Sequence, residues 1–495
     1  MNGVILQFFH WYHPGKLWNE FIDKAEYLKS LGFTAVWFPP AIKCALGTDG
    51  RGYDVYDLYD LGEFDQKGSI PTRYGTKEEY IKAIEKAHEV GMKVYADIVL
   101  NHRMGADEME TVTVHQVNEE NRNEVIRETF KADAMTKFTF PGRNGKYSDF
   151  IWDYQCFSGI DKVKTSDEEQ QGIFKIYNEY GTDWNENVSH QFGNYDYLMG
   201  ADVEFRNPYV VEELKRWIKW YIDTTKVDGL RMDALKHIST EFLKEWIDYI
   251  KSEIDEDFFI VGEFWKDDVG KITGFSEKMD HRICSFDVPL HFNFFRASQE
   301  KQNYNLIEIL KGTFLDCNPE CSVSFVGNHD TQKLQALEST VEDWFRPIAY
   351  AVILLSENAY PCVFYPDLFG AEYIDKNADG VDEKIIMPKV KILPRLMQAR
   401  QEFAYGEQVN YFDHPNCIAW IRKGNENHNG CVVIISNSEE GYKEMDLGKE
   451  NASAEFTDFL GFRKEIIELD EDGKGTFWVN AASVSVWIKN QDQSI

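Results

Sequence analysis

Three carboxylates in this sequence each end a short apolar segment, where a folded chain would bring a charge to the edge of its core. They are Asp233, Glu263 and Asp330, which follow residues 227–232, 258–262 and 323–329. A charge in such a position costs free energy unless it is paired or takes part in chemistry. Two carboxyl groups that flank a bond, one protonated and one ionised, are the groups that hydrolyse a glycosidic bond. The pattern therefore indicates acid–base chemistry at the ends of several strands.

The surroundings of two of these carboxylates predict different protonation states. Arg231 and Asp233 are two residues apart, so they share one side of a strand, and a purely structural ion pair would explain this segment equally well by itself. Beside Arg231, Asp233 is expected to stay ionised and to act as a nucleophile. Glu263 stands between Val261-Gly262 and Phe264-Trp265, and this apolar setting favours the protonated acid.

The elements that must position these groups alternate between strand and helix. Strands are predicted near residues 4, 34, 93, 228, 258, 285, 322 and 360. The capping box Thr76-Lys77-Glu78-Glu79 begins one helix, Asn207-Pro208 begins another, and Thr240 is expected to cap a third. Eight such units predict an α/β fold, a (β/α)8 barrel, in which chemistry collects at the carboxyl ends of the strands. Asp97 and His102 flank the end of the third strand.

Two segments depart from this alternation. From Arg103 to about Arg206 the chain is polar and has no sustained period, so an irregular, β-rich inserted domain is expected after the third strand. From about Gln398, short alternating strands are typical of a C-terminal antiparallel β-sandwich. The predicted organisation is a barrel from residues 1–103 and 207–397, an insertion at 104–206 and a β-sandwich at 398–495.

The composition is acidic, with 53 Lys plus Arg against 84 Asp plus Glu and a formal charge of −31. This charge argues against nucleic acid or a membrane as a partner and suits a neutral substrate or bound cations. No leader-like segment, no membrane-spanning run and no zinc pattern among the eight cysteines is evident. A cytoplasmic monomer with free thiols is expected, and a secreted mature form given a new Met1 stays the alternative.

Four segments combine the charged residues above with a fixed order along the chain. They are Asp97-Ile98-Val99-Leu100-Asn101-His102, Gly229-Leu230-Arg231-Met232-Asp233-Ala234, Val261-Gly262-Glu263-Phe264-Trp265 and Phe325-Val326-Gly327-Asn328-His329-Asp330. These segments resemble, in the same order, the four signature segments of the α-amylase family (glycoside hydrolase family 13). With the insertion and the C-terminal strands, the resemblance covers essentially the whole chain. Within the family, the chain most resembles the bacterial liquefying and cytoplasmic enzymes.

The resemblance implies a role for each matching residue. Asp233 would be the nucleophile, Glu263 the general acid/base, and Asp330 the group that stabilises the distorted sugar at the cleaved bond. The implied substrate-binding residues are Tyr53 as an aromatic platform, His102 and His329 as hydroxyl ligands, Arg231 beside Asp233, and Lys236, His237 and Trp265 on the leaving-group side. The implied reaction is internal hydrolysis of an α-1,4-glucan such as starch, glycogen or maltodextrin. It would retain the anomeric configuration, with the two carboxyl groups about 5–5.5 Å apart.

The resemblance also implies a structural calcium ion between the barrel and the insertion. Its oxygen ligands would be Asn101, Asp196, Asp202 and the backbone carbonyl of His237. Asp161 and Asp183 match ligands of a neighbouring sodium or second calcium ion, although ordinary solvated acids would explain both equally well. Glu204 and Arg206 stand where the liquefying enzymes usually have aspartate, and the charge of Arg206 disfavours a second cation.

Other interpretations share parts of this pattern. An α-glucosidase or glucanotransferase of the same family would keep the three carboxylates, whereas a glucan-binding relative without catalysis would be expected to lack at least one. An unrelated barrel enzyme would need a phosphate loop or an inward lysine, and neither is evident. Asp375-Lys376-Asn377-Ala378-Asp379-Gly380 begins like an EF-hand loop, but its twelfth position is Ile386, so a turn is predicted instead.

Overall fold

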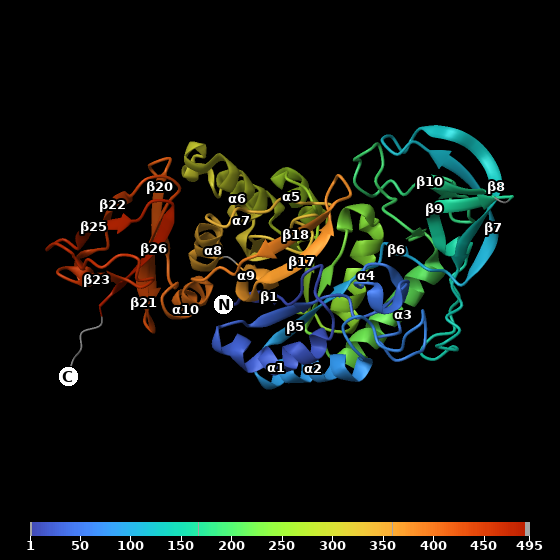
Figure 1. Ribbon diagram of the computed structural model, residues 1–495, viewed down its shortest axis with the longest axis horizontal. Coiled ribbons are helices and arrows are strands. Elements are labelled where there is room, and N and C mark those ends of the chain that lie inside the picture. The colour runs from blue at the N-terminus through green and yellow to red at the C-terminus, as the bar shows by residue number, and fades with distance from the viewer. Residues whose placement is uncertain (1, 167, 359, 491–495) are drawn as a thin grey trace.

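Eight parallel strands close into a barrel in this computed structural model, which describes residues 2–166, 168–358 and 360–490. Around the ring, the strands are β1 (Ile5–Gln7), β2 (Ala35–Phe38), β5 (Lys93–Ile98), β12 (Gly229–Met232), β13 (Phe259–Gly262), β14 (Cys284–Phe286), β15 (Ser322–Phe325) and β16 (Tyr360–Phe364). Each lies at a predicted position, so the (β/α)8 fold is confirmed. The barrel forms the centre of the molecule in Figure 1.

Helices cover the outside of the barrel and bury one apolar face each against it. They are α1 (Leu17–Ser30), α2 (Lys77–Glu89), α3 (Pro208–Thr225), α4 (Thr240–Glu253), α5 (Val269–Lys278), α6 (Val288–Glu300), α8 (Arg346–Leu355) and α10 (Leu393–Glu402). The capping box at Thr76 and the Asn207 cap are confirmed. The cap of α4 was predicted one residue too late, because Ser239 rather than Thr240 accepts the backbone N–H of Phe242.

The insertion is more regular than predicted. It forms a six-stranded sheet in the order β10-β7-β8-β9-β11-β6. Its strands are β6 (His102–Arg103), β7 (Glu108–Val117), β8 (Val125–Lys137), β9 (Phe157–Thr165), β10 (Glu168–Ile176) and β11 (Ala201–Val203). The sequence pattern did not predict strand β8, because the first half of the strand is exposed and its inward residues, Ala132, Ala134 and Thr136, are small or polar. The expectation of a β-rich insertion was right, and that of an irregular one was wrong.

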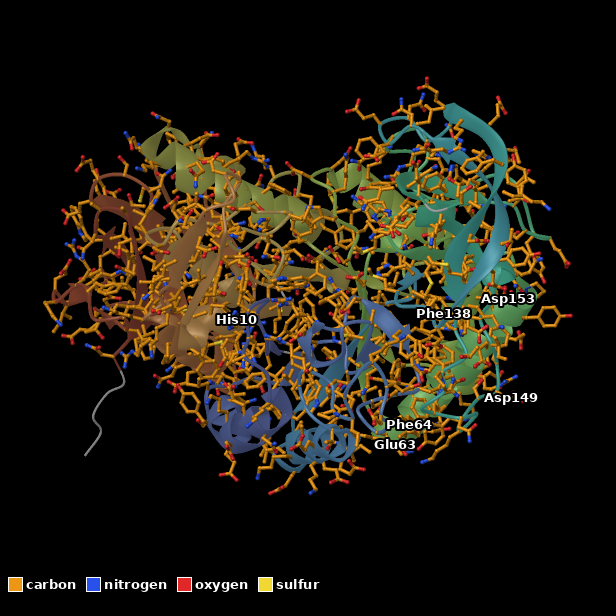
Figure 2. The ribbon with its side chains drawn as sticks, turned by 45° about the vertical axis from the view of Figure 1, so that its right-hand side comes forward. His10, Glu63, Phe64, Phe138, Asp149 and Asp153 are labelled. Carbon is orange, nitrogen blue, oxygen red and sulfur yellow. The ribbon has the colours of Figure 1, made fainter. Side chains whose placement is uncertain are left out.

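The insertion is joined to the barrel side through Glu63, which lies in the loop that precedes α2. The Glu63 carboxylate accepts hydrogen bonds from Lys77 Nζ at 2.7 Å and from Tyr147 Oη at 2.9 Å, and it also pairs with Lys146. Figure 2 labels Glu63 and Phe64 in this region, with Asp149 of the insertion nearby. These contacts tie the loop between β8 and β9 to the barrel loop that precedes α2.

Two packed antiparallel sheets form the C-terminal part, at the left of Figure 1. One has the order β19 (Gln408–Tyr411), β20 (Cys417–Asn425), β21 (His428–Ser436), β26 (Ser483–Lys489), β23 (Glu455–Asp458) and β24 (Ile467–Glu468), and the other pairs β22 (Gly441–Asp446) with β25 (Lys474–Val479). The predicted boundary at residue 397 falls inside α10, so the last barrel helix continues past it. The boundaries at residues 103 and 206 stay predictions.

The fold also bears on two smaller predictions, which concern the EF-hand-like segment and the cysteines. The EF-hand-like segment is the turn between β17 (Ala371–Lys376) and β18 (Asp382–Met387), where the N–H of Gly380 donates to the carbonyl of Asn377 at 2.8 Å. All eight cysteines are free thiols. Within the described ranges, none of the helices has the length and apolar character needed to cross a membrane.

Candidate active site

The guanidinium of Arg231 joins three carboxylates that come from three neighbouring barrel strands. Its Nη1 donates to Asp233 Oδ1 at 2.7 Å and to Asp97 Oδ1 at 2.9 Å. Its Nη2 donates to Glu263 Oε2 at 2.5 Å. The sequence predicted a contact between Arg231 and Asp233, and the bonds to Glu263 and Asp97 are a finding of the structure.

The parallel ladder explains why these side chains meet. Asp97 and Arg231 are directly paired residues of β5 and β12, and Arg231 is paired with Val261 of β13. The ladder continues past the strand ends, since Asp233 N donates to Ile98 O at 3.1 Å and Glu263 N donates to Met232 O at 2.9 Å. The backbone then turns sharply at Ala234, a non-glycine residue with φ of 54°. Both carboxylates are thereby held at the same end of the barrel.

Burial sets the electrostatics of the acid candidate. Burial raises the pKa of Glu263 above its ordinary value, Arg231 opposes that shift, and the charge of Asp233 adds to it. Burial also raises the pKa of Asp97 to about 7, again against Arg231. The raised pKa of Glu263 agrees with the prediction that it holds its proton. Its surroundings are less apolar than the sequence indicated, because Arg231 donates a hydrogen bond to it.

Asp330 and His329 lie across the barrel mouth from Arg231, at the end of β15. Gln7 Nε2 donates to His329 Nδ1 at 3.1 Å, so the ring proton lies on Nε2, which is 3.2 Å from Asp330 Oδ2. Burial lowers the pKa of His329 well below its ordinary value, so the ring is neutral. For Asp330, burial and the nearby charge of Glu263 raise the pKa. This places a neutral donor beside Asp330.

Ring side chains, among them Tyr53, lie at the same end of the barrel as His329. The Tyr53 ring stacks on His329 with centroids 5.2 Å apart, and its hydroxyl donates to Asp97 Oδ2 at 2.8 Å. His102 Nε2 bonds the carbonyl oxygen of Tyr53 at 2.8 Å, and His102 Nδ1 is a buried polar atom without a protein partner. Three of the predicted substrate residues, Tyr53, His102 and His329, therefore lie together.

The residues predicted for the leaving-group side divide into two sets. Lys236 Nζ approaches the Trp265 carbonyl at 3.5 Å, so these two residues are neighbours. His237 instead points its ring at the insertion, where Nδ1 lies 2.8 Å from the Tyr195 carbonyl oxygen. Burial and the charge of Lys236 lower the pKa of His237 to about 3, so this ring is neutral, and its predicted role in substrate binding stays a prediction.

The expected cation ligands meet where the insertion joins the barrel. Asn101 Nδ2 donates to Asp202 Oδ1 at 3.1 Å, and Asn101 Oδ1 is buried without a partner. Burial and the neighbouring charge of Asp196 raise the pKa of Asp202 far above its ordinary value. Among the residues that the structure describes, no three Asp, Glu, His or Cys side chains form a metal cage. A cation here would therefore depend on two carboxylates together with amide and carbonyl oxygens, and the unpartnered Asn101 oxygen fits such a ligand.

The two acids expected for a neighbouring cation lie close to this group. Asp202 is paired with Gly159 of β9 at a bulge that includes Ser158, so Asp161, two residues after Gly159, faces the same side as Asp202. The Asp161 carboxylate accepts the N–H of Gly200 at 3.2 Å. Asp183 is exposed, and its carboxylate accepts a bond from its neighbour Thr182 at 3.4 Å. The charges of Asp161 and Asp202 both act on Tyr197, and those of Asp183 and Asp196 both act on Arg206.

Two residues of the site were given no role from the sequence. Asp97 was recognised near the end of the third strand and in the first signature segment, but its bonds to Arg231 and Tyr53 are a finding of the structure. Trp11 stacks on Tyr53 with centroids 5.8 Å apart and runs nearly parallel to His329. Nothing in the local sequence distinguishes Trp11 from a core tryptophan.

Comparisons with known proteins agree with this geometry. The family model described as "Alpha amylase, catalytic domain" matches residues 16–391. The cytoplasmic α-amylase of Escherichia coli strain K12 is 47% identical over 490 residues, covering 98% of this chain and 99% of that protein. An α-amylase of Geobacillus stearothermophilus is 42% identical over 493 residues, covering 98% of this chain and 87% of its own length. The solved α-amylase of Geobacillus thermoleovorans in complex with acarbose has a TM-score of 0.65 at 19% identity and covers 99% of both chains, which supports the fold.

Proposed function

The chain belongs to the α-amylase family of glycoside hydrolases, and we propose from that premise that it cleaves internal α-1,4 bonds of starch, glycogen or maltodextrins with retention. The observation that carries the proposal is the Arg231 guanidinium, which contacts Asp233 and Glu263 at once. Retaining hydrolysis needs two carboxyl groups held close together but in different protonation states.

Each carboxyl group has a separate task in this proposal. Asp233, bonded to Arg231 at 2.7 Å, attacks the anomeric carbon, and Glu263 gives its proton to the departing glycosidic oxygen. The raised pKa of Glu263 keeps that proton available. In the second half, the deprotonated Glu263 takes a proton from water as water attacks the glycosyl–Asp233 ester. Asp330 and the neutral His329 bind sugar hydroxyls, and Tyr53 supports the ring.

The oxygen atoms at the barrel–insertion junction favour the proposal of one bound calcium ion. Asn101 Oδ1, the carboxylates of Asp196 and Asp202 and the carbonyl of His237 would hold it, and bound calcium would supply positive charge that neutralises two buried acids. We propose a cytoplasmic location as well, which the similarity to the cytoplasmic α-amylase of E. coli and the eight free thiols support. A monomer is the proposed state.

Product analysis on a long maltooligosaccharide blocked at its non-reducing end tests the activity. We expect wild type to release α-anomers, as seen by NMR, and Glu263→Gln to lose about 10³–10⁴-fold in rate because the leaving oxygen receives no proton. Cleavage of unblocked chains alone would favour an α-glucosidase, and growth of longer chains would favour a glucanotransferase. Binding without any cleavage by wild type would contradict the catalytic proposal.

Calcium removal provides an independent test of the junction. We expect a chelator to lower the stability of wild type by about 3 kcal/mol relative to calcium at a hundred times its dissociation constant, because the ion binds only the folded chain. Asp202→Asn should abolish this difference in thermal unfolding. Asp223→Asn is the matched control and should keep it, since Asp223 is an exposed acid of α3 that pairs with Lys219.

A further inference from the structure

Three buried acids and two basic side chains share one small region beside the proposed calcium position. Asp196, Asp202 and Glu204 are at most 3% exposed, and Lys175 of β10 is fully buried among them. Lys175 Nζ donates to the Ser158 carbonyl at 2.8 Å and lies within electrostatic range of all three carboxylates. A buried ammonium group needs such acids nearby, because removing it from water is costly.

Arg206 completes this group from the other side. Its Nε donates to Glu204 Oε1 at 2.7 Å and its Nη2 to Glu204 Oε2 at 2.6 Å, a two-point contact that uses both carboxylate oxygens. The same Nη2 donates to the backbone carbonyl of Asp183 at 2.9 Å. The carboxylate of Glu204 and the carbonyl of Asp183, which could otherwise ligate a neighbouring metal ion, are therefore hydrogen-bonded to the Arg206 guanidinium.

The backbone around Arg206 is shaped to receive the guanidinium. A Cβ atom placed on Gly181 would lie 2.4 Å from Arg206 Nη1, so the absence of a side chain there gives Arg206 its room. Asp161 is partly exposed and Asp183 is exposed, so solvent screens their charges more than those of the three buried acids. The guanidinium is thus a packed part of the junction.

The two basic side chains offset most of the negative charge of this group. The three buried acids carry three negative charges, and Lys175 and Arg206 together carry two positive charges. A single divalent ion is enough to neutralise the remainder, whereas a second would face a guanidinium and an ammonium at close range. We infer that Lys175 and Arg206 are fixed cations that take the place of a second metal ion in this chain. The inference deepens the proposed calcium site and does not depend on the proposed catalytic roles.

Metal stoichiometry tests the inference. Calcium titration calorimetry and elemental analysis of dialysed protein should give one more bound ion per chain for Arg206→Asp than for wild type, because the substitution removes a cation and adds a carboxylate ligand. Arg216→Asp, an exposed arginine of α3, is the control and should leave the stoichiometry unchanged. Two ions in wild type, or no gain in Arg206→Asp, would overturn the inference.

A second variant keeps the test decisive if Arg206→Asp does not fold. Arg206→Gln removes the charge and keeps most of the volume, so Glu204 is left buried without its partner. We expect its unfolding temperature to fall in chelator and to rise more steeply with added calcium than that of wild type. An equal calcium response in the two proteins would contradict the fixed-cation role. A wild type that binds no calcium would refute the calcium site itself, and the difference between variant and wild type would still report on Arg206.

Discussion

Asp233→Ala is expected to lower kcat/KM on long maltooligosaccharides by on the order of 10⁵-fold, as the loss of a nucleophile does in other covalent mechanisms. The reason is geometric, because Asp233 is held at the strand end by both its backbone bond to Ile98 and its side-chain bond to Arg231. No neighbouring carboxylate can replace it, since Asp97 is bound to Tyr53, Trp37 and Arg231. Steady-state kinetics on wild type and variant would measure this loss.

Azide added to two variants separates the two catalytic roles. In Asp233→Ala, azide can enter the vacated space and attack from the side of the missing nucleophile, which yields an inverted β-glycosyl azide. In Glu263→Ala, the ester on Asp233 still forms from a substrate with a good leaving group, and azide then attacks it to give the α-glycosyl azide. The same anomer from both variants would contradict the assignment of Asp233 and Glu263.

Arg231→Met is expected to lose both stability and activity. The substitution removes the guanidinium, so Asp97, Asp233 and Glu263 lose the cation that they share. This loss should lower the free energy of unfolding by about 3–5 kcal/mol. Hydrolysis should fall as well, because Asp233 and Glu263 both lose the bond that orients them. Denaturant unfolding and kinetics at a temperature where the variant stays folded would measure the two effects.

Arg400→Met is the matched control for that substitution. Arg400 is also a buried arginine, but the bonds described for it include those to the backbone carbonyls of Leu354 and Gly3. We expect this variant to lose stability and to keep its activity wherever it remains folded. If Arg231→Met hydrolysed maltooligosaccharides at the wild-type rate while folded, Arg231 would be a stability residue and nothing more.

Several features were readable from the sequence because they depend on neighbours along the chain. Apolar runs and helix caps located all eight barrel strands, and a charge directly after such a run marked Asp233, Glu263 and Asp330. In a parallel barrel all strands end on one face, so local patterns were sufficient to bring these residues to the same end of the molecule. The raised pKa expected for Glu263 likewise follows from burial, which apolar neighbours predict.

Other features were decided by tertiary structure, because they depend on register and on which side of a strand a residue faces. Only the pairing of β5, β12 and β13 shows that one Arg231 serves Asp97, Asp233 and Glu263 together. The bulge at Ser158 could not be read from the sequence either, and it pairs Asp202 with Gly159, which brings Asp161 to the same face of the insertion as Asp202. The bond from Arg206 to Glu204 is local, but the room that Gly181 leaves for the guanidinium exists only in the folded insertion.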